Sequence, residues 1–72
     1  MMNAEFVMRD GRVLARIINL AHRFNCGYSA IDVRPSNGAF AARIDFTGAA
    51  DALRRFEAQL NKLLETEKEI YS

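Results

Sequence analysis

Residues 28–46, YSAIDVRPSNGAFAARIDF, contain two segments in which apolar and polar side chains alternate, separated by a turn signal. The signal is Asn37-Gly38, a pair that tolerates the two positive φ angles of a tight hairpin turn. Alternation with a period of two is typical of a strand with one buried face. The sequence therefore predicts a β-hairpin with strands over about 28–34 and 39–46.

The register of this hairpin is also predictable, because a two-residue loop fixes which residues lie opposite each other. The predicted pairs are Val33 with Ala42, Ile31 with Ile44, and Asp32 with Arg43. The first two pairs are apolar and the third is charged, so the two faces agree in phase. The same alternation predicts that Tyr28 lies on the face that carries Asp32.

The segments on either side of the hairpin show a strand pattern and two helix patterns. Residues 4–9 alternate and predict a strand, and Asp10 can accept hydrogen bonds from the amides that open a helix. Apolar residues recur at steps of three and four over 11–24 and 49–64. This spacing predicts two helices, each with one apolar face.

The order of these elements predicts the α+β class, as a ferredoxin-like βαββαβ sandwich with an antiparallel sheet and two helices on one face. Residues 65–72 either prolong the second helix or return as a short edge strand over 66–71, and we favour the strand. Phe6, Phe40 and Phe46 are predicted to point toward the helices. The other sheet face is predicted to show Glu5, Val7, Ala30, Asp32, Ala39, Ala41, Arg43 and Asp45.

Length and composition favour a small globular chain. Seventy-two residues predict a single domain over 1–72, and a core of that size leaves little stability, so a homodimer is expected. Ten basic and nine acidic residues are interspersed, which argues against nucleic-acid and membrane partners. The first residues lack the basic segment and apolar run typical of a signal peptide, and no stretch is apolar enough to span a membrane, so neither secretion nor spanning is expected. The single Cys26 suits a reducing compartment, and a cytoplasmic location is therefore expected.

The sequence predicts neither catalytic nor metal-binding residues, and no cofactor. His22 has no nucleophile or carboxylate nearby in the sequence and is expected to be a partly exposed helix residue. Cys26 follows a helix C-terminus, where the helix dipole disfavours a thiolate, so an inert thiol is expected.

Three other functions of this topology fit the residues less well. RNA binding needs aromatic side chains on the open sheet face, whereas the phenylalanines are predicted to be in the core. Metallochaperones carry Cys-x-x-Cys where this chain has Asp10-Gly11-Arg12. A phosphatase could use Arg12 to clamp a phosphoryl group, but a glycine-rich anion cradle is missing. Local sequence favours a plain tight turn here over a small-anion site at the helix N-terminus.

Three segments carry a resemblance to a known family: RDGRVLARI at 9–17, RFN at 23–25 and QLNKL at 59–63. Together they resemble the ACT domain, in the form found in regulatory small subunits of acetolactate synthase (acetohydroxyacid synthase). The resemblance covers nearly the whole chain. It implies a subunit of branched-chain amino-acid biosynthesis that binds the thiamine-diphosphate-dependent catalytic large subunit and raises its activity. The cofactor belongs to that partner.

The resemblance also implies an effector site, because many members transmit feedback inhibition by valine. In such domains the amino acid lies between two protomers, with backbone amides meeting its carboxylate. Carried over to this chain, the effector-binding residues are Asp10, Gly11, Arg12, Val13 and Asn25.

The loop of this chain departs from the family pattern at one point. The family carries Pro-Gly directly before the valine, where this chain has Gly11-Arg12. A β-carbon and a guanidinium at Arg12 would crowd a site that glycine leaves open. The departure, together with the short chain, favours the valine-insensitive kind of small subunit. The alternative is a free-standing ACT domain that binds an amino acid as a sensor.

Overall fold

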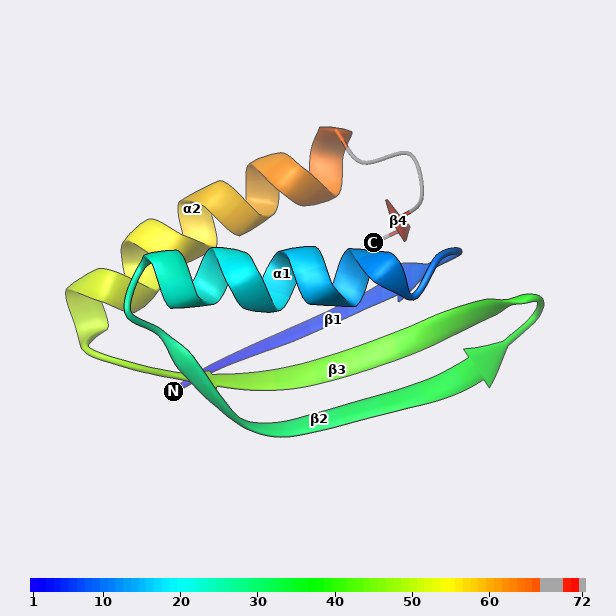
Figure 1. Cartoon of the computed structure of the whole chain (residues 1–72), viewed down its shortest axis with the longest axis horizontal. Coiled ribbons are helices and arrows are strands. Elements are labelled where there is room, and N and C mark those ends of the chain that lie inside the picture. The colour runs from blue at the N-terminus through cyan, green and yellow to red at the C-terminus, as the bar shows by residue number, and fades with distance from the viewer. Residues whose placement is uncertain (67–69, 72) are drawn as a thin grey trace.

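The computed structural model describes residues 1–66 and 70–71, and it shows one antiparallel sheet packed against two helices (Figure 1). The elements are β1 (Met2–Met8), α1 (Arg12–Arg23), β2 (Gly27–Ser36), β3 (Ala39–Thr47), α2 (Ala50–Thr66) and β4 (Ile70–Tyr71). The strands lie in the order β2-β3-β1-β4. This α+β arrangement is compatible with the predicted ferredoxin-like fold.

The hairpin of β2 and β3 has the predicted register. Val33 lies opposite Ala42, and the pairing continues to Ser36 opposite Ala39. Asn37 and Gly38 occupy the turn with φ angles of 49° and 80°. A two-residue hairpin turn of type I′ requires positive φ angles at both central residues, and Asn-Gly accommodates them. This turn sets the pairing of β2 with β3.

The predicted side of Tyr28 is wrong. The register shifts between Tyr28 and Ala30, because Ser29 is an extra residue that bulges out of β2. The bulge reverses the alternation beyond it, so Tyr28 lies opposite Phe46, on the side of the sheet that faces the helices. Tyr28 is nevertheless 47% exposed, since it lies at the start of an edge strand.

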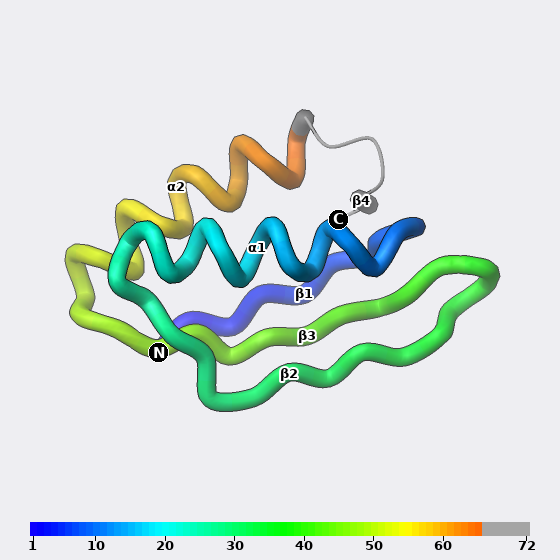
Figure 2. The backbone as a smooth tube through the Cα atoms, viewed as in Figure 1, coloured from blue at the N-terminus to red at the C-terminus, as the bar shows by residue number. Residues whose placement is uncertain are grey.

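Both helices cover the same face of the sheet, as the backbone trace in Figure 2 shows. Each strand directs alternate side chains toward them, and each helix directs its apolar face back. The buried core comprises Phe6, Met8, Val13, Ile17, Ala21, Cys26, Ala42, Ile44, Phe46, Leu53, Phe56 and Leu60. At its centre Phe46 and Phe56 meet edge to face, with ring centroids 4.7 Å apart.

Phe40 is a second correction, because it was predicted to lie in the core with Phe6 and Phe46. The latter two are buried, but Phe40 is 38% exposed. Its phase is right, since it lies opposite Met8 on the side that faces the helices. It stands next to the hairpin turn, at the end of the sheet where β2 and β3 run on past β1.

The C-terminal segment forms both of the structures that were considered for it. Helix α2 runs two residues past its predicted end to Thr66, and β4 then pairs antiparallel with β1. The predicted strand over 66–71 is thus shortened to Ile70–Tyr71, and its residues 67–69 lie outside the described part of the chain.

We expect Phe46→Ala to unfold the domain under conditions in which Phe40→Ala stays folded. Replacing a fully buried phenylalanine by alanine costs about 3–5 kcal/mol, which is about the whole stability of a core this small. Phe40 is partly in water already, so its loss costs much less. Circular dichroism during urea unfolding measures both variants. Equal losses would contradict the burial difference between the two positions.

Candidate functional site

The loop between β1 and α1 carries four of the five predicted site residues, and its conformation is set by Asp10. One carboxylate oxygen, Oδ1, accepts a hydrogen bond from the backbone N–H of Arg12 at 2.9 Å. The other, Oδ2, accepts bonds from the Arg12 side chain, from Nε at 2.8 Å and from Nη2 at 2.6 Å. Three hydrogen bonds therefore connect Arg12 to the Asp10 carboxylate across Gly11.

The side-chain hydrogen bonds from Arg12, followed by the bond from its backbone amide, lower the pKa of Asp10 below its ordinary value of 3.8. Hydrogen bonds to a carboxylate favour its charged form, which explains the direction. The Arg12 side chain is 89% exposed, so solvent screens the ion pair and its contribution to stability is modest. Its main effect is to hold the loop in one shape.

The amides that open helix α1 are already bound inside the loop. Besides the Arg12 amide, the N–H of Val13 donates to the Asp10 carbonyl oxygen at 3.1 Å, and the N–H of Leu14 donates to the Gly11 carbonyl oxygen at 3.1 Å. An incoming carboxylate would have to displace the Asp10 side chain to reach the Arg12 amide. Val13 itself is buried, with its side chain in the core.

Gly11 does not adopt a backbone conformation that only glycine allows. Its φ and ψ are −61° and −17°, which any residue adopts. A β-carbon added at Gly11 would have no neighbour within 4 Å. The space above this residue is therefore open, and neither the turn nor the packing of this chain requires glycine there.

Asn25, the fifth predicted site residue, lies at the other end of α1. Its φ of 59° is the left-handed conformation that ends the helix, and its N–H donates to the His22 carbonyl oxygen at 3.0 Å. A 12-residue helix is about 18 Å long, so Asn25 and the Asp10 loop are that far apart in one protomer. One chain does not bring the predicted site together.

Cys26 and His22 are placed as the sequence predicts. Cys26 is buried, its Sγ lies 3.6 Å from the Phe24 carbonyl oxygen, and burial raises the pKa of its thiol. A buried thiol with a raised pKa is a poor nucleophile. His22 is exposed on α1. Among residues 1–66 and 70–71, no group of three or more His, Cys, Asp or Glu is placed to hold a metal ion.

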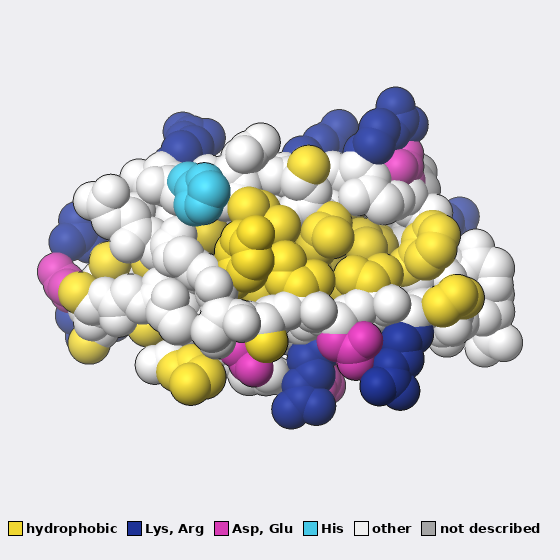
Figure 3. Space-filling view, turned by 60° about the horizontal axis from the view of Figure 1, so that its bottom comes forward, with side chains coloured by type: hydrophobic (Ala, Val, Ile, Leu, Met, Phe, Trp, Pro, Cys, Tyr) yellow, Lys and Arg dark blue, Asp and Glu magenta, His cyan; other side chains and the backbone are white. Residues whose placement is uncertain are grey.

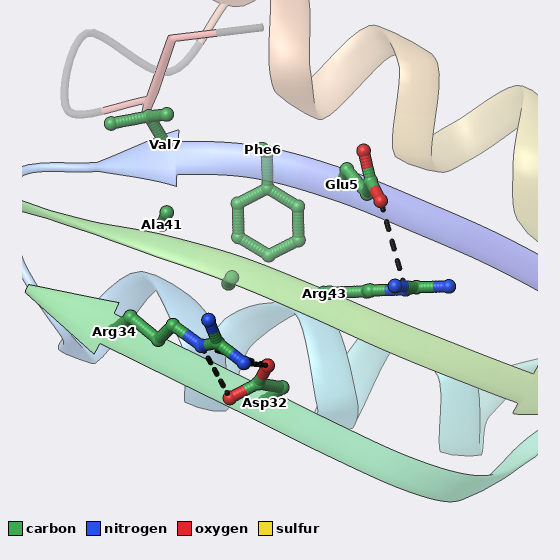
Figure 4. Close-up of a pocket in the computed structure, with 8 residues that line it drawn as sticks. Glu5, Phe6, Val7, Asp32, Arg34, Ala41 and Arg43 are labelled. Carbon is green, nitrogen blue, oxygen red and sulfur yellow. Dashed lines mark hydrogen bonds and ion pairs between the residues drawn. The ribbon is translucent and has the colours of Figure 1, made fainter. Parts of the chain in front are cut away.

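Sequence reasoning missed a shallow groove of about 380 Å³ on the sheet face that the helices leave open (Figure 4). Two ion pairs flank Ala41 there: Glu5 with Arg43 at 3.6 Å, and Asp32 with Arg34 at 3.1 Å. The sequence placed most of these residues on the open face, but it did not indicate that Asp32 pairs along its own strand with Arg34.

All four charged side chains of the groove are more than half exposed. Exposed ion pairs of this kind contribute little to stability. Their exposure leaves these side chains accessible to another molecule. Within the part of the chain that the structure describes, every polar or charged side chain lies outside the buried core. Any polar side chain that binds a ligand or partner therefore does so at the surface of the described residues.

Comparisons with protein-family models, with curated proteins and with solved structures found no match to this chain. Neither helix, over the residues described, is long and apolar enough to cross a membrane.

We expect Asp10→Asn to destabilise the fold at pH 7 and to lose this effect in acid. Because the pKa of Asp10 is lowered in the folded chain, its carboxylate stabilises the fold above the ordinary value of 3.8. That contribution disappears as the pH falls through the lower folded-state pKa. The difference in urea midpoint between wild type and variant should therefore shrink below pH 3.8. Glu57→Gln, at an exposed position on α2, is the control. A difference independent of pH would contradict this account.

Proposed function

We propose that this chain is a non-catalytic regulatory or assembly subunit with a ferredoxin-like, ACT-type βαββαβ fold. The observation that supports this best is the distribution of its surfaces. Two helices cover one sheet face, while the described residues leave the other face and the backbone edge of β2 uncovered, and exposed charged side chains line that open face. Uncovered sheet faces and edges are surfaces through which domains bind other chains.

The particular partner that we propose is the catalytic large subunit of acetolactate synthase, a thiamine-diphosphate-dependent enzyme. This step rests on the resemblance of residues 9–17, 23–25 and 59–63 to the small regulatory subunits of that enzyme. The element order and the all-antiparallel pairing suit an ACT-type domain. In this role the chain acts as a homodimer in the cytoplasm and contributes binding surface, while the partner contributes the chemistry.

We further propose the valine-insensitive kind of small subunit. The amides that would receive the carboxylate of an amino acid are bound by the Asp10 side chain and by loop carbonyl groups. The Arg12 guanidinium, paired with the same carboxylate, stands where the family has glycine. An amino-acid sensor would need these contacts to open before its ligand could bind.

The purified chain is expected to co-elute with the cognate acetolactate synthase catalytic subunit in size-exclusion chromatography and to raise its activity. The physical reason is that the partner covers surface that this small domain leaves open. The control is the catalytic subunit with an equal amount of an unrelated small protein. Unchanged elution and unchanged activity together would reject the proposed function.

Isothermal calorimetry with valine, leucine and isoleucine is expected to show no binding to the purified chain. The Asp10 carboxylate already binds the backbone amide of Arg12 within the same chain. The carboxylate of an added amino acid would therefore have to displace Asp10 from this amide. A saturable heat signal with any of the three would favour the amino-acid sensor instead.

A further inference from the structure

A groove of about 310 Å³ lies where α1 and α2 meet, away from the sheet. Its lining comprises Arg16, Asn19, Leu20 and Arg23 of α1 and Leu63 of α2. The two leucines are partly buried and pack against the core. The other three side chains are exposed. The groove therefore has an apolar floor and, along α1, a polar rim.

The rim residues lie in line because of the helical repeat of α1. Arg16 and Arg23 are seven residues apart, which is about two turns, so they lie on one side of the helix about 10.5 Å apart along its axis. Asn19 and Leu20 lie one turn from each of them. Two cations thus stand at the ends of the groove, with the apolar floor beginning between them.

Helix α1 differs from the rest of the surface in the sign of its charges. Its residues 12–23 include three arginines and no aspartate or glutamate. Figure 3 shows Lys and Arg side chains along the upper border of the molecule, above a band of hydrophobic side chains. On α2, by contrast, Asp51 and Arg55 pair at 3.0 Å. The net charge of the chain is only +1, so the positive potential is local to α1.

No acidic side chain lines the groove to balance these cations. Arg23 in particular has no ion-pair partner among residues 1–66 and 70–71. A carboxylate from another molecule would therefore meet an exposed guanidinium beside an apolar surface. Arginine suits this contact because its planar guanidinium can donate two parallel hydrogen bonds to one carboxylate.

Three other occupants fit the groove less well. A second copy presenting the same groove would bring Arg16 and Arg23 against their own copies, and like charges across an interface are unfavourable. The end of this chain is engaged elsewhere, since Ile70 and Tyr71 pair with β1. Nucleic-acid binding commonly uses about six to ten phosphate contacts. Two arginines in a chain of net charge +1 do not provide them.

We propose that this groove docks an acidic amphipathic helix of the catalytic subunit. Amphipathic helices bind grooves through apolar residues on one face. Two carboxylates seven residues apart on such a helix have the same two-turn spacing as Arg16 and Arg23. An apolar side chain between these carboxylates then contacts Leu20 and Leu63. The proposal therefore specifies the charge, the spacing and the apolar residue of the partner segment.

This inference deepens the proposed function and rests on it, because it names the surface through which the chain holds its catalytic partner. It adds a surface on the helix side of the domain to the open sheet face and the β2 edge. The charges of the open face are paired with one another, as Glu5 is with Arg43. The groove on α1 offers cations alone, so it favours a partner segment of one charge sign.

The test is the affinity of the full chain for the cognate acetolactate synthase catalytic subunit, measured by isothermal calorimetry. Arg23→Glu is expected to raise the dissociation constant about 10-fold or more, because it sets a carboxylate against the carboxylates of the partner. Asn19→Arg adds a cation at an exposed position of the same rim and is expected to lower the dissociation constant. Circular dichroism checks that both variants fold.

Arg54→Glu is the matched control. It makes the same charge change at an exposed position of α2. Arg54 and Leu63 are nine residues apart, about two and a half turns, so Arg54 points away from the groove. This variant is expected to bind the catalytic subunit as wild type does. Equal weakening by Arg23→Glu and Arg54→Glu would indicate unspecific attraction of charge and would overturn the proposal.

The dependence on salt gives a second readout. The Debye length falls from about 10 Å at about 0.1 M salt to about 3 Å at about 1 M. The dissociation constant of wild type is therefore expected to rise over this range. Arg23→Glu has already lost one attractive pair, so its dissociation constant should rise less. Parallel salt dependence of the two proteins would contradict a contact at Arg23.

Cross-linking identifies the partner residue. Arg23→Lys keeps the positive charge, and a carbodiimide joins a lysine amine to a carboxylate in contact with it, with loss of water. Mass spectrometry of the cross-linked complex is expected to show a link from position 23 to an aspartate or glutamate of the catalytic subunit. That residue should lie in a segment with helical spacing of apolar residues. A complex with links only at other positions would overturn the proposed site.

The remaining outcomes separate the groove from the proposed function. A complex that forms equally well with Arg23→Glu and with wild type would reject the groove and keep the function. Absence of any complex with wild type would reject the function, and the docking proposal with it. If Arg23→Glu changes only the self-association of the chain in analytical ultracentrifugation, the occupant is a second copy and the proposal is wrong.

Discussion

The turn at Asn37-Gly38 is the constraint on which the remaining structure depends. It fixes the register of β2 against β3, and strand register decides which side chains face the helices. A shift of one residue would turn Ile44 and Phe46 toward water and carry Asp45 into the core. Because the Phe46 ring packs against the Phe56 ring of α2, the turn also determines where α2 packs on the sheet.

Much of this could be predicted from the sequence, because local periodicity and turn chemistry carry the information. What failed depended on features that periodicity does not contain. The Ser29 bulge adds one residue to a strand, and alternation counted along the chain cannot detect it. Phe40 lies on the side of β3 that faces the helices, as the alternation predicts, but its side chain is partly exposed. This exposure depends on its position near the hairpin turn, opposite the last residue of β1.

The candidate site was likewise predictable only in part from the sequence. Sequence identified the Asp10 loop as the opening of α1 and noted the unusual Arg12, yet it could not reveal that the Asp10 carboxylate binds both the amide and the guanidinium of Arg12. That contact depends on side-chain geometry over a three-residue turn. It converts a loop open above Gly11 into one whose amides are already satisfied.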